Sequence, residues 1–328
     1  MISRRTFSLA GGASLLAAHR FGLGQAGAPM RRVAYLQYGR DVQPNPQREA
    51  FLRGMRELGW QEGKNVDYRF SNADFDERRL DFLLSEALAW KAEVIVTGSG
   101  ASVRAAQRAT KTTPIVMAYI ANAVGNGFVA SLAHPGGNIT GSTTQAEEIL
   151  AKQIELLREV APRAARMAIL INENNPSQAE YWSVGRRACA ALGLTALRIV
   201  ANAPEQIGPA VQQLLQQGAQ AVAVPGDPLF NTERVRLNEA LFATRLPTAY
   251  GLRENALAGG LLSYGPDIPT SHRNAARFVD KILKGAKPAD LPVEQPTKFD
   301  MVVNMKTAKA LGITSPYSVM LRATEVIE

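Results

Sequence analysis

The sequence has few of the residues that build covalent or metal-bound frameworks. Its 328 residues include one cysteine and three histidines, His19, His134 and His272. A single cysteine excludes an internal disulfide and a cysteine-based metal site, and so few histidines leave little for a histidine-rich zinc site. We therefore expect no metal and no other cofactor. We expect Cys189 to be a small, buried hydrophobic residue.

Long runs of one charge and long apolar runs are also missing. Charged residues make up 20% of the chain and hydrophobic residues 46%, which is typical of a globular protein and not of a disordered one. Acidic and basic residues alternate without a lysine- or arginine-rich tract, so we expect no nucleic-acid partner. No apolar stretch is long enough for a transmembrane helix, so we expect no stable membrane insertion.

The first 28 residues contain no acidic side chain. Arg4 and Arg5 precede an apolar stretch over residues 7–18, and small residues at 26–28 suit a cleavage site. Residues 3–9 (SRRTFSL) resemble the twin-arginine export consensus; a Sec signal and a first helix of the fold are the alternatives. Cleavage after Ala28 would leave 34 basic and 29 acidic side chains, which lowers the formal charge from +8 to +5.

Short β-rich runs alternate with segments of helical period after residue 30. Strands are predicted in two series, at 32–38, 65–70, 93–97 and 114–119, and again at 166–171, 195–200, 220–224 and 247–250. Helices of the second series are predicted at 177–192, 204–217 and 231–244. The alternation predicts an α/β fold with parallel sheets covered by helices on both faces. Its repetition predicts two doubly wound lobes.

The remaining segments are predicted to join the lobes through a multi-strand hinge. Residues 138–142 form an extended crossing, and further strands are predicted at 260–264 and 298–304, with helices at 269–284 and 305–311. Several crossings make a hinge and not a free linker. The expected division is an export signal at 1–28, an N-terminal lobe of 29–142 plus 251–287, and a C-terminal lobe of 143–250 plus 288–328.

Four motifs resemble, in order, segments of one protein family. They are residues 59–66 (GWQEGKNV), 134–141 (HPGGNITG), 259–266 (GGLLSYGP) and 284–297 (KGAKPADLPVEQPT). Together they resemble the tryptophan/tyrosine-type family of ABC transporter substrate-binding proteins, over nearly all of residues 31–328.

The resemblance implies a type I periplasmic-binding-protein fold and a periplasmic protein that is not an enzyme. Such a protein captures a small solute, here an amino acid or an aromatic carboxylate among the candidates. It delivers that solute to an ABC permease and its ATPase subunit. Two lobes closing on the solute predict a monomer with one solute per chain. Where the family has Asp-Pro after the fourth strand, this sequence has Asn122-Ala123, so a relative's ligand preference does not transfer directly.

The candidate site follows from the rule that ligands of open parallel sheets bind beyond the carboxyl ends of the strands. Gly98, Ser99 and Gly100 form a loop before a helix whose first N–H groups suit a carboxylate. Ser99 or Ser102 caps that helix, and the alternative is a plain tight turn with an N-cap. The expected ligand-binding residues are Tyr38, Gly98, Ser99, Gly100, Ser102, Tyr119, Asn122, Asn174, Asp227 and Tyr250.

Two kinds of contact are expected in the other loops. Asp227, in a Pro-Gly-Asp-Pro turn at a strand end, is a candidate acceptor for a substrate ammonium group, or else the N-cap of the next helix. Tyr38, Tyr119 and Tyr250 end three strands, where their rings suit stacking on an apolar or aromatic solute.

Two other functions remain open for an α/β chain. An exported enzyme would need a base and a nucleophile in the cleft, and neither His134 nor His272 is expected at a strand end beside a serine or cysteine. A histidine that lines the cleft would favour this alternative. A periplasmic sensor for a membrane signalling partner would capture a solute in the same way as a transport protein.

Overall fold

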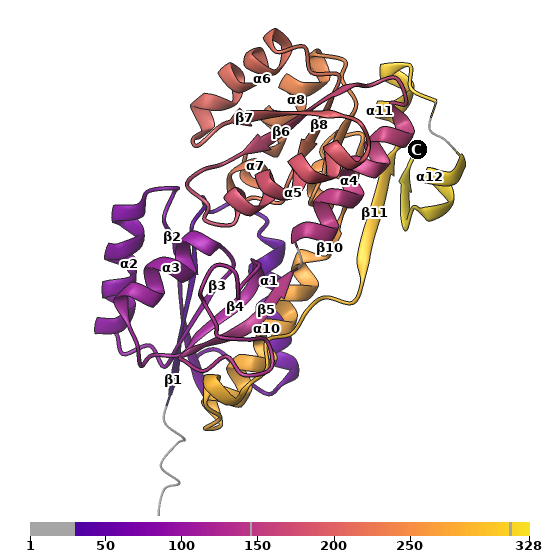
Figure 1. Ribbon diagram of the computed structural model, residues 1–328. Coiled ribbons are helices and arrows are strands. Elements are labelled where there is room, and N and C mark those ends of the chain that lie inside the picture. Colours follow the sequence, from indigo (N-terminus) through magenta and orange to yellow (C-terminus); the bar gives the residue numbers. More distant parts are fainter. Residues whose placement is uncertain (1–29, 145, 315–316) are drawn as a thin grey trace, which may run out of the picture.

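The computed structural model describes residues 30–144, 146–314 and 317–328 and has two lobes (Figure 1). The first lobe contains a five-stranded parallel sheet of order β2-β1-β3-β4-β5. Its elements are β1 (Arg31–Gln37), α1 (Pro46–Glu57), β2 (Val66–Asn72), α2 (Glu77–Ala89), β3 (Val94–Thr97), α3 (Gly100–Ala109), β4 (Ile115–Ala121), β5 (Ile139–Thr144), α10 (Ile268–Leu283) and η2 (Pro288–Asp290).

Alternating apolar side chains on β1 explain why helices cover both faces of this sheet. Val33 and Tyr35 are buried against α1 and α10, whereas Ala34 and Leu36 are buried against α2 and α3. Figure 1 shows these two helix pairs on opposite sides of the lower lobe. The predicted parallel sheet with helices on both faces is confirmed here.

The second lobe contains a seven-stranded sheet of order β12-β11-β10-β9-β8-β6-β7, in which only the β10–β11 pair is antiparallel among the described strands. Its elements are α4 (Ala146–Val160), β6 (Arg166–Ile171), α5 (Gln178–Ala191), β7 (Thr195–Val200), η1 (Pro204–Gln206), α6 (Ile207–Gln216), β8 (Ala221–Val224), α7 (Pro228–Thr232), α8 (Arg234–Ala243), β9 (Thr248–Tyr250), α9 (Arg253–Leu257), β10 (Leu262–Pro266), β11 (Phe299–Asn304), α11 (Met305–Leu311), α12 (Tyr317–Arg322) and β12 (Glu325–Ile327).

The core of the second lobe is built by the same alternation as that of the first. On β6, Met167 and Ile169 face α4 and α5, whereas Ala168 and Leu170 face α6 and α8. Cys189 is fully buried in the first of these layers, as expected, and burial raises the pKa of its thiol to about 11.

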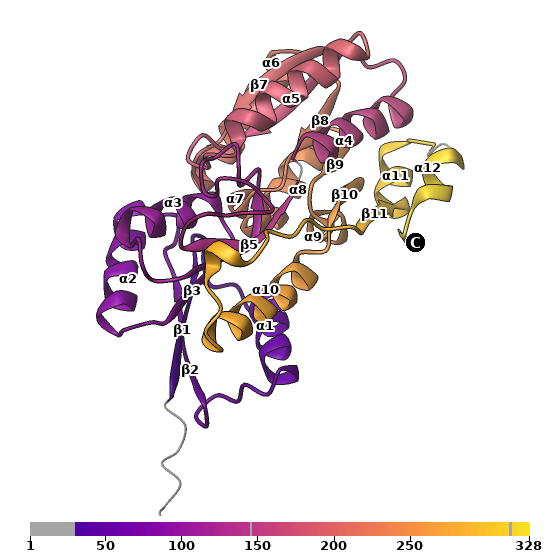
Figure 2. The same ribbon diagram turned by 60° about the horizontal axis from the view of Figure 1, so that its bottom comes forward.

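The chain passes between the lobes after β5, after β10 and before β11 (Figure 2). The expected lobe boundary after residue 250 is wrong for β10, which pairs with β9 and β11 in the second sheet. The boundary at 287 is also too early. Leu291 and Val293 are buried in the cores of the first lobe, and the Thr140 hydroxyl donates to the Leu291 carbonyl at 2.7 Å.

One predicted helix is divided in two. The segment expected as a single helix over 231–244 consists of α7 and α8, which are separated at Glu233. The first of them starts earlier than expected, because Asp227 caps it and Pro228 occupies its first position. Within the described residues, no helix combines the length and the apolar character needed to cross a membrane.

Candidate ligand-binding site

A cavity lies between the lobes at the carboxyl ends of their parallel strands, where the strand-end rule places a ligand. From the first lobe it is lined by the loops after β1 and β3, by the end of β4 and by one face of α10; from the second lobe, by the loops after β6, β8 and β9 and the starts of the helices that follow them. The predicted residues that line it are Tyr38, Gly98, Ser99, Gly100, Tyr119 and Asp227. Ligand contact by these residues stays a prediction.

The other predicted residues lie outside the cavity wall, each for a local reason. Ser102 is fully buried behind Ser99, with the two Oγ atoms 2.8 Å apart. Asn122 adopts a left-handed conformation (φ 44°), and its side-chain oxygen accepts from the Gly125 N–H at 2.8 Å. This bond closes a turn and directs the amide away from the cavity.

Two residues of the second lobe that were predicted to bind the ligand, Asn174 and Tyr250, do not line the cavity. Asn174 is exposed and donates its side-chain amide to the Asn202 carbonyl at 3.2 Å, while the next residue, Asn175, is buried and lines the cavity. Tyr250 is 1% exposed and belongs to the core beneath the sheet. It therefore supports the fold, not the cavity wall.

The start of α3 forms part of the first-lobe wall. Ser99 caps the helix, because its Oγ accepts from the Ser102 N–H at 3.1 Å. A Cβ atom at Gly98 would lie 2.9 Å from the His272 ring, and one at Gly100 would lie 3.2 Å from the Asn175 side-chain oxygen. A side chain at Gly98 would therefore displace the His272 ring, and one at Gly100 would be in tight contact with Asn175. The first N–H groups of α3 have no acceptor within the helix, and the residues at its start, Ser99 and Gly100, line the cavity.

Asp227 is the N-cap of α7, as one of its two interpretations predicts. Its carboxylate accepts from the Leu229 N–H at 2.8 Å and from the side-chain amides of Asn172 and Asn175 at 3.0 and 2.7 Å. A fourth donor, the amide of Gln178, lies at 3.3 Å. Burial raises the pKa of Asp227, while these hydrogen bonds act in the opposite direction. Its lone pairs are thus largely occupied by the protein itself.

Glu254 is an acid of the cavity that the sequence analysis misses. It lies in the first turn of α9, four residues beyond the end of β9, and it lines the cavity. Its Oε2 atom is buried and has no hydrogen-bond partner among the described residues. Burial is the main cause that raises the pKa of this carboxyl. A buried carboxylate oxygen with free lone pairs is suited to an ammonium group.

A histidine also lines the cavity, although none is expected there. His272 of α10 is 3% exposed, and its Nδ1 lies 2.7 Å from the Tyr35 hydroxyl. Burial lowers its pKa to about 3, so the ring is neutral at physiological pH. Its partner is a phenol and not a serine or cysteine, so His272 does not form a nucleophile–base pair.

The rest of the wall combines polar side chains, such as Asn231 and Arg234, with an aromatic and aliphatic part. The apolar part includes Tyr119, Tyr181, Leu252 and Ile268, and burial raises the pKa of Tyr119 to about 12. Tyr38 also lines it, but its hydroxyl already donates to the Phe75 carbonyl at 3.1 Å. Such a wall suits an apolar or aromatic portion of a solute.

The lobes touch at the rim of the cavity. Arg40 of the first lobe forms an ion pair with Glu233 of the second, with Nη1 and Oε1 2.9 Å apart. On another side, the Asn126 amide donates to the Ser177 hydroxyl at 3.2 Å. These contacts join the two lobes at the rim of the cavity.

Comparisons with known proteins agree with this architecture. The model of the family described as "ABC transporter substrate binding protein" matches residues 45–327. The chain belongs to this family. Its members bind solutes and are not enzymes, so the histidine in the cavity does not make this chain a catalyst.

Individual relatives are distant but cover most of the chain. A "Tyrosine-binding protein" of Clostridioides difficile (strain R20291) is 23% identical over 81% of this chain and 76% of its own length. A conserved domain protein of Vibrio cholerae has 23% identity and a TM-score of 0.85, over 90% of this chain and 99% of that one. An ABC domain from Streptococcus pneumoniae in complex with L-Trp has 24% identity and a TM-score of 0.83, over 91% and 100%. The fold of this substrate-binding protein is thus the type I periplasmic-binding-protein fold.

Proposed function

We propose that this substrate-binding protein is exported to the periplasm, captures an α-amino acid in the cavity and delivers it to an ABC permease with its ATPase subunit. The observation that carries the amino-acid assignment is the pairing of opposite binding groups in one cavity. The N-terminus of α3 lies on the first-lobe wall, and the free Oε2 of Glu254 lies on the second-lobe wall. An amino acid has the two complementary charged groups.

The carboxylate end is assigned to α3. The first N–H groups of a helix have no intrahelical acceptors, and the helix dipole places partial positive charge there. Ser99 holds this end in place as the N-cap, and Gly98 and Gly100 on either side line the cavity. Backbone donors of this kind are well suited to a carboxylate.

The ammonium end is assigned to Glu254 and no longer mainly to Asp227. The Asp227 carboxylate already accepts from a backbone N–H and three side-chain amides. Glu254 retains a buried oxygen that is free to accept. A charge-assisted hydrogen bond from the solute would satisfy that oxygen and lower the raised pKa of the carboxyl.

The side chain of the solute is assigned to the apolar part of the wall. Tyr119, Tyr181, Leu252 and Ile268 suit an aromatic or large aliphatic group. The relatives named for tyrosine and crystallised with L-Trp support an aromatic side chain. We therefore place L-tyrosine and L-tryptophan first among the candidates.

The transport role rests on capture followed by closure. Solute that binds one lobe favours closure only through its greater affinity for the closed form. The residues over 1–28, with paired arginines before an apolar stretch, support export. One cavity between two lobes of a single chain supports a monomer that binds one solute.

A thermal-shift and calorimetric screen of residues 29–328 tests the proposal. The panel contains L-tyrosine, L-tryptophan, L-leucine, tyramine, 3-(4-hydroxyphenyl)propionate, a sugar and a nucleoside. A tight solute raises the unfolding midpoint by mass action. We expect an amino acid to do so, and we expect tyramine and the propionate, which each lack one charged group, to bind at least tenfold more weakly. Stabilisation by the sugar or the nucleoside alone would overturn the amino-acid assignment.

A further inference from the structure

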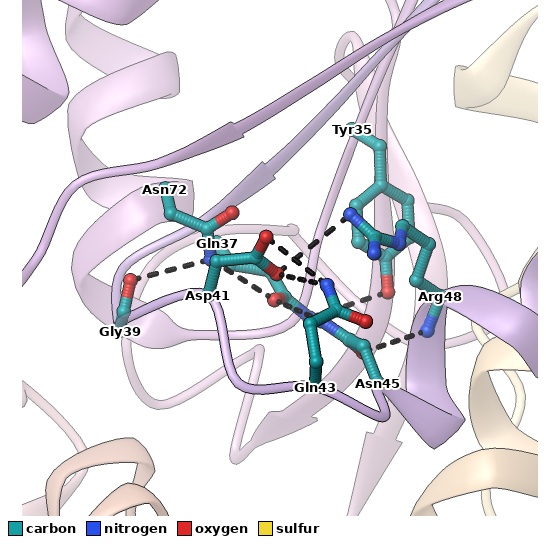
Figure 3. Close-up of polar contacts among 8 residues, drawn as sticks. All are labelled: Tyr35, Gln37, Gly39, Asp41, Gln43, Asn45, Arg48 and Asn72. Atoms are coloured by element: carbon teal, nitrogen blue, oxygen red, sulfur yellow. Dashed lines mark hydrogen bonds and ion pairs between the residues drawn. The ribbon is translucent and has the colours of Figure 1, made fainter.

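A chain of side-chain hydrogen bonds runs from the N-cap of α1 to His272 at the cavity, and Figure 3 shows its first part, from Asn45 through Gln37 to Tyr35. It begins at Asn45, whose side-chain oxygen accepts from the Arg48 backbone N–H at 3.0 Å. A backbone N–H can only donate, so the Asn45 amide has one possible orientation. Its nitrogen therefore faces the opposite way, toward Gln37.

Gln37 is oriented by two such donors. Its Oε1 accepts from the Nδ2 atoms of Asn45 and Asn72, at 3.1 and 3.3 Å. A flipped Gln37 would place an NH₂ group against two other NH₂ groups. The Nε2 of Gln37 consequently faces the Tyr35 hydroxyl, at 3.5 Å.

The Tyr35 hydroxyl is thereby fixed as a donor. It is buried, and Gln37 presents only a donor group to it, so the phenolic proton has His272 Nδ1, at 2.7 Å, as its acceptor. A neutral imidazole carries one proton. Because Nδ1 accepts, that proton is on Nε2. Burial supports this state, since it keeps the pKa of Tyr35 well above its usual value and that of His272 well below.

The protonated nitrogen faces the site. Nε2 lies 3.0 Å from where a Cβ atom of Gly98 would be, next to the start of α3, and His272 lines the cavity. None of the described residues is hydrogen bonded to Nε2, and this atom is not among their buried polar atoms without a partner, although His272 as a whole is 3% exposed. Nε2 is therefore open to the cavity, where its proton can be donated to an acceptor of a bound solute.

We infer that His272 binds the solute directly, as a fixed neutral donor whose Nε2–H points to a carboxylate oxygen at the start of α3. The inference rests on the proposed function, because it assumes that the solute has a carboxylate. Tyr35, Gln37 and Asn45 are positioning residues that hold the ring in the donating tautomer. The orientation also gives specificity, since a fixed Nε2–H cannot accept a hydrogen bond from an ammonium group placed there.

Nitrogen NMR of the imidazole rings tests the relay without a ligand. Residues 29–328 contain two histidines, His134 and His272, and a His134→Gln variant assigns the signals. We expect His272 to show an unprotonated Nδ1 and a protonated Nε2, unchanged from pH 5 to pH 8. In Tyr35→Phe the tautomer should become mixed. A protonated Nδ1 in the unmodified protein would overturn the inference.

Binding of L-tyrosine tests the contact itself. We expect the Nε2–H proton signal to shift and to exchange more slowly with water when L-tyrosine is bound. His272→Phe should weaken L-tyrosine by roughly tenfold to a hundredfold and should leave tyramine, which lacks the carboxylate, within about twofold. Exposed His134 provides the matched control, and His134→Gln should bind like the unmodified protein.

The outcomes separate this inference from the proposed function. If L-tyrosine binds and the His272 signals do not change, His272 is a wall residue and only the inference fails. If His272→Phe weakens L-tyrosine and tyramine equally, its effect is one of shape and the inference also fails. If none of L-tyrosine, L-tryptophan and L-leucine binds, the proposed function fails, and the carboxylate contact fails with it even when the tautomer is as expected.

Discussion

Asp227 and Glu254 are two acids in the same cavity wall, and they differ in what their oxygens do. Burial raises the pKa of both carboxyls. Asp227 accepts hydrogen bonds from a helix start and from three side-chain amides. Glu254 leaves a buried oxygen without any partner among the described residues. Burial and location are therefore shared by the two acids, and only their hydrogen bonds distinguish them as candidates for an ammonium group.

The largest effect is expected from Asp227→Ala, which should act on stability. The change removes the cap of α7 and leaves buried amide donors unsatisfied, so we expect the free energy of unfolding to fall by about 3 kcal/mol. Urea unfolding measures it. The matched control is Asp76→Ala, which removes the exposed N-cap of α2 and should lose only about 1 kcal/mol. An equal loss in the two variants would remove the distinction drawn for Asp227.

Glu254→Gln should act on binding and not on stability. The change keeps the size of the side chain but removes the negative charge that we propose binds the ammonium group of the solute. We expect the affinity for L-tyrosine to fall by about tenfold to a hundredfold in calorimetry. The midpoint of urea unfolding should stay the same or rise, because a buried charge is removed. Unchanged affinity would show that the ammonium binds elsewhere, with Asp227 the next candidate.

The pH dependence of stability and of L-tyrosine affinity tests the role that we propose for Glu254. The folded pKa of Glu254 is raised above its ordinary 4.5, mainly by burial, with Asp267 acting in the same direction and Arg253 and Arg234 against it. As pH rises from 4.5 through the raised pKa, the folded form alone holds the proton, so the stability of the free protein falls. The affinity for L-tyrosine should rise over that window, by up to tenfold per pH unit. A calorimetric series at several pH values measures this, and Glu254→Gln should flatten the curve.

Much of the fold could be predicted because its signals are local. Periodic apolar residues and turn residues placed most strands within two or three residues of their observed ends. Some failures were local, since no helix was predicted over α4 and the helix expected over 231–244 is divided in two. Others were non-local. The sequence predicted a strand near residue 262, but which sheet receives β10 depends on pairing with β9 and β11, and pairing partners leave no local pattern.

The residues of the candidate site also fall into those that the sequence predicted and those that it did not. The strand-end rule found the loops that carry Ser99, Tyr119 and Asp227, because topology alone places them at one edge. It missed His272, which lines the cavity from α10, a helix of the first lobe that the chain enters after β10 of the second lobe. It also missed Glu254, whose importance depends on the absence of a hydrogen-bond partner among the described residues. Hydrogen-bond partners of this kind can be identified only from the folded structure, in which segments distant in the sequence lie side by side.

The smallest effect is expected at the rim of the cavity, where Arg40 of the first lobe forms an ion pair with Glu233 of the second. Arg40 is about half exposed, with 53% of its side chain accessible, so this pair should contribute less than 1 kcal/mol. Arg40→Ala should therefore shift the lobes toward the open form only slightly and weaken L-tyrosine by about twofold. Glu233→Gln should do the same, the double variant should add nothing, and moderate salt should reduce the effect. Scattering measures the opening of the lobes, and calorimetry measures the affinity for L-tyrosine.

Arg40 also lines the cavity. A tenfold loss of affinity in Arg40→Ala alone would therefore mean that Arg40 contacts the solute. The carboxylate of the solute would then have a charged partner at the rim as well as the neutral donors at α3.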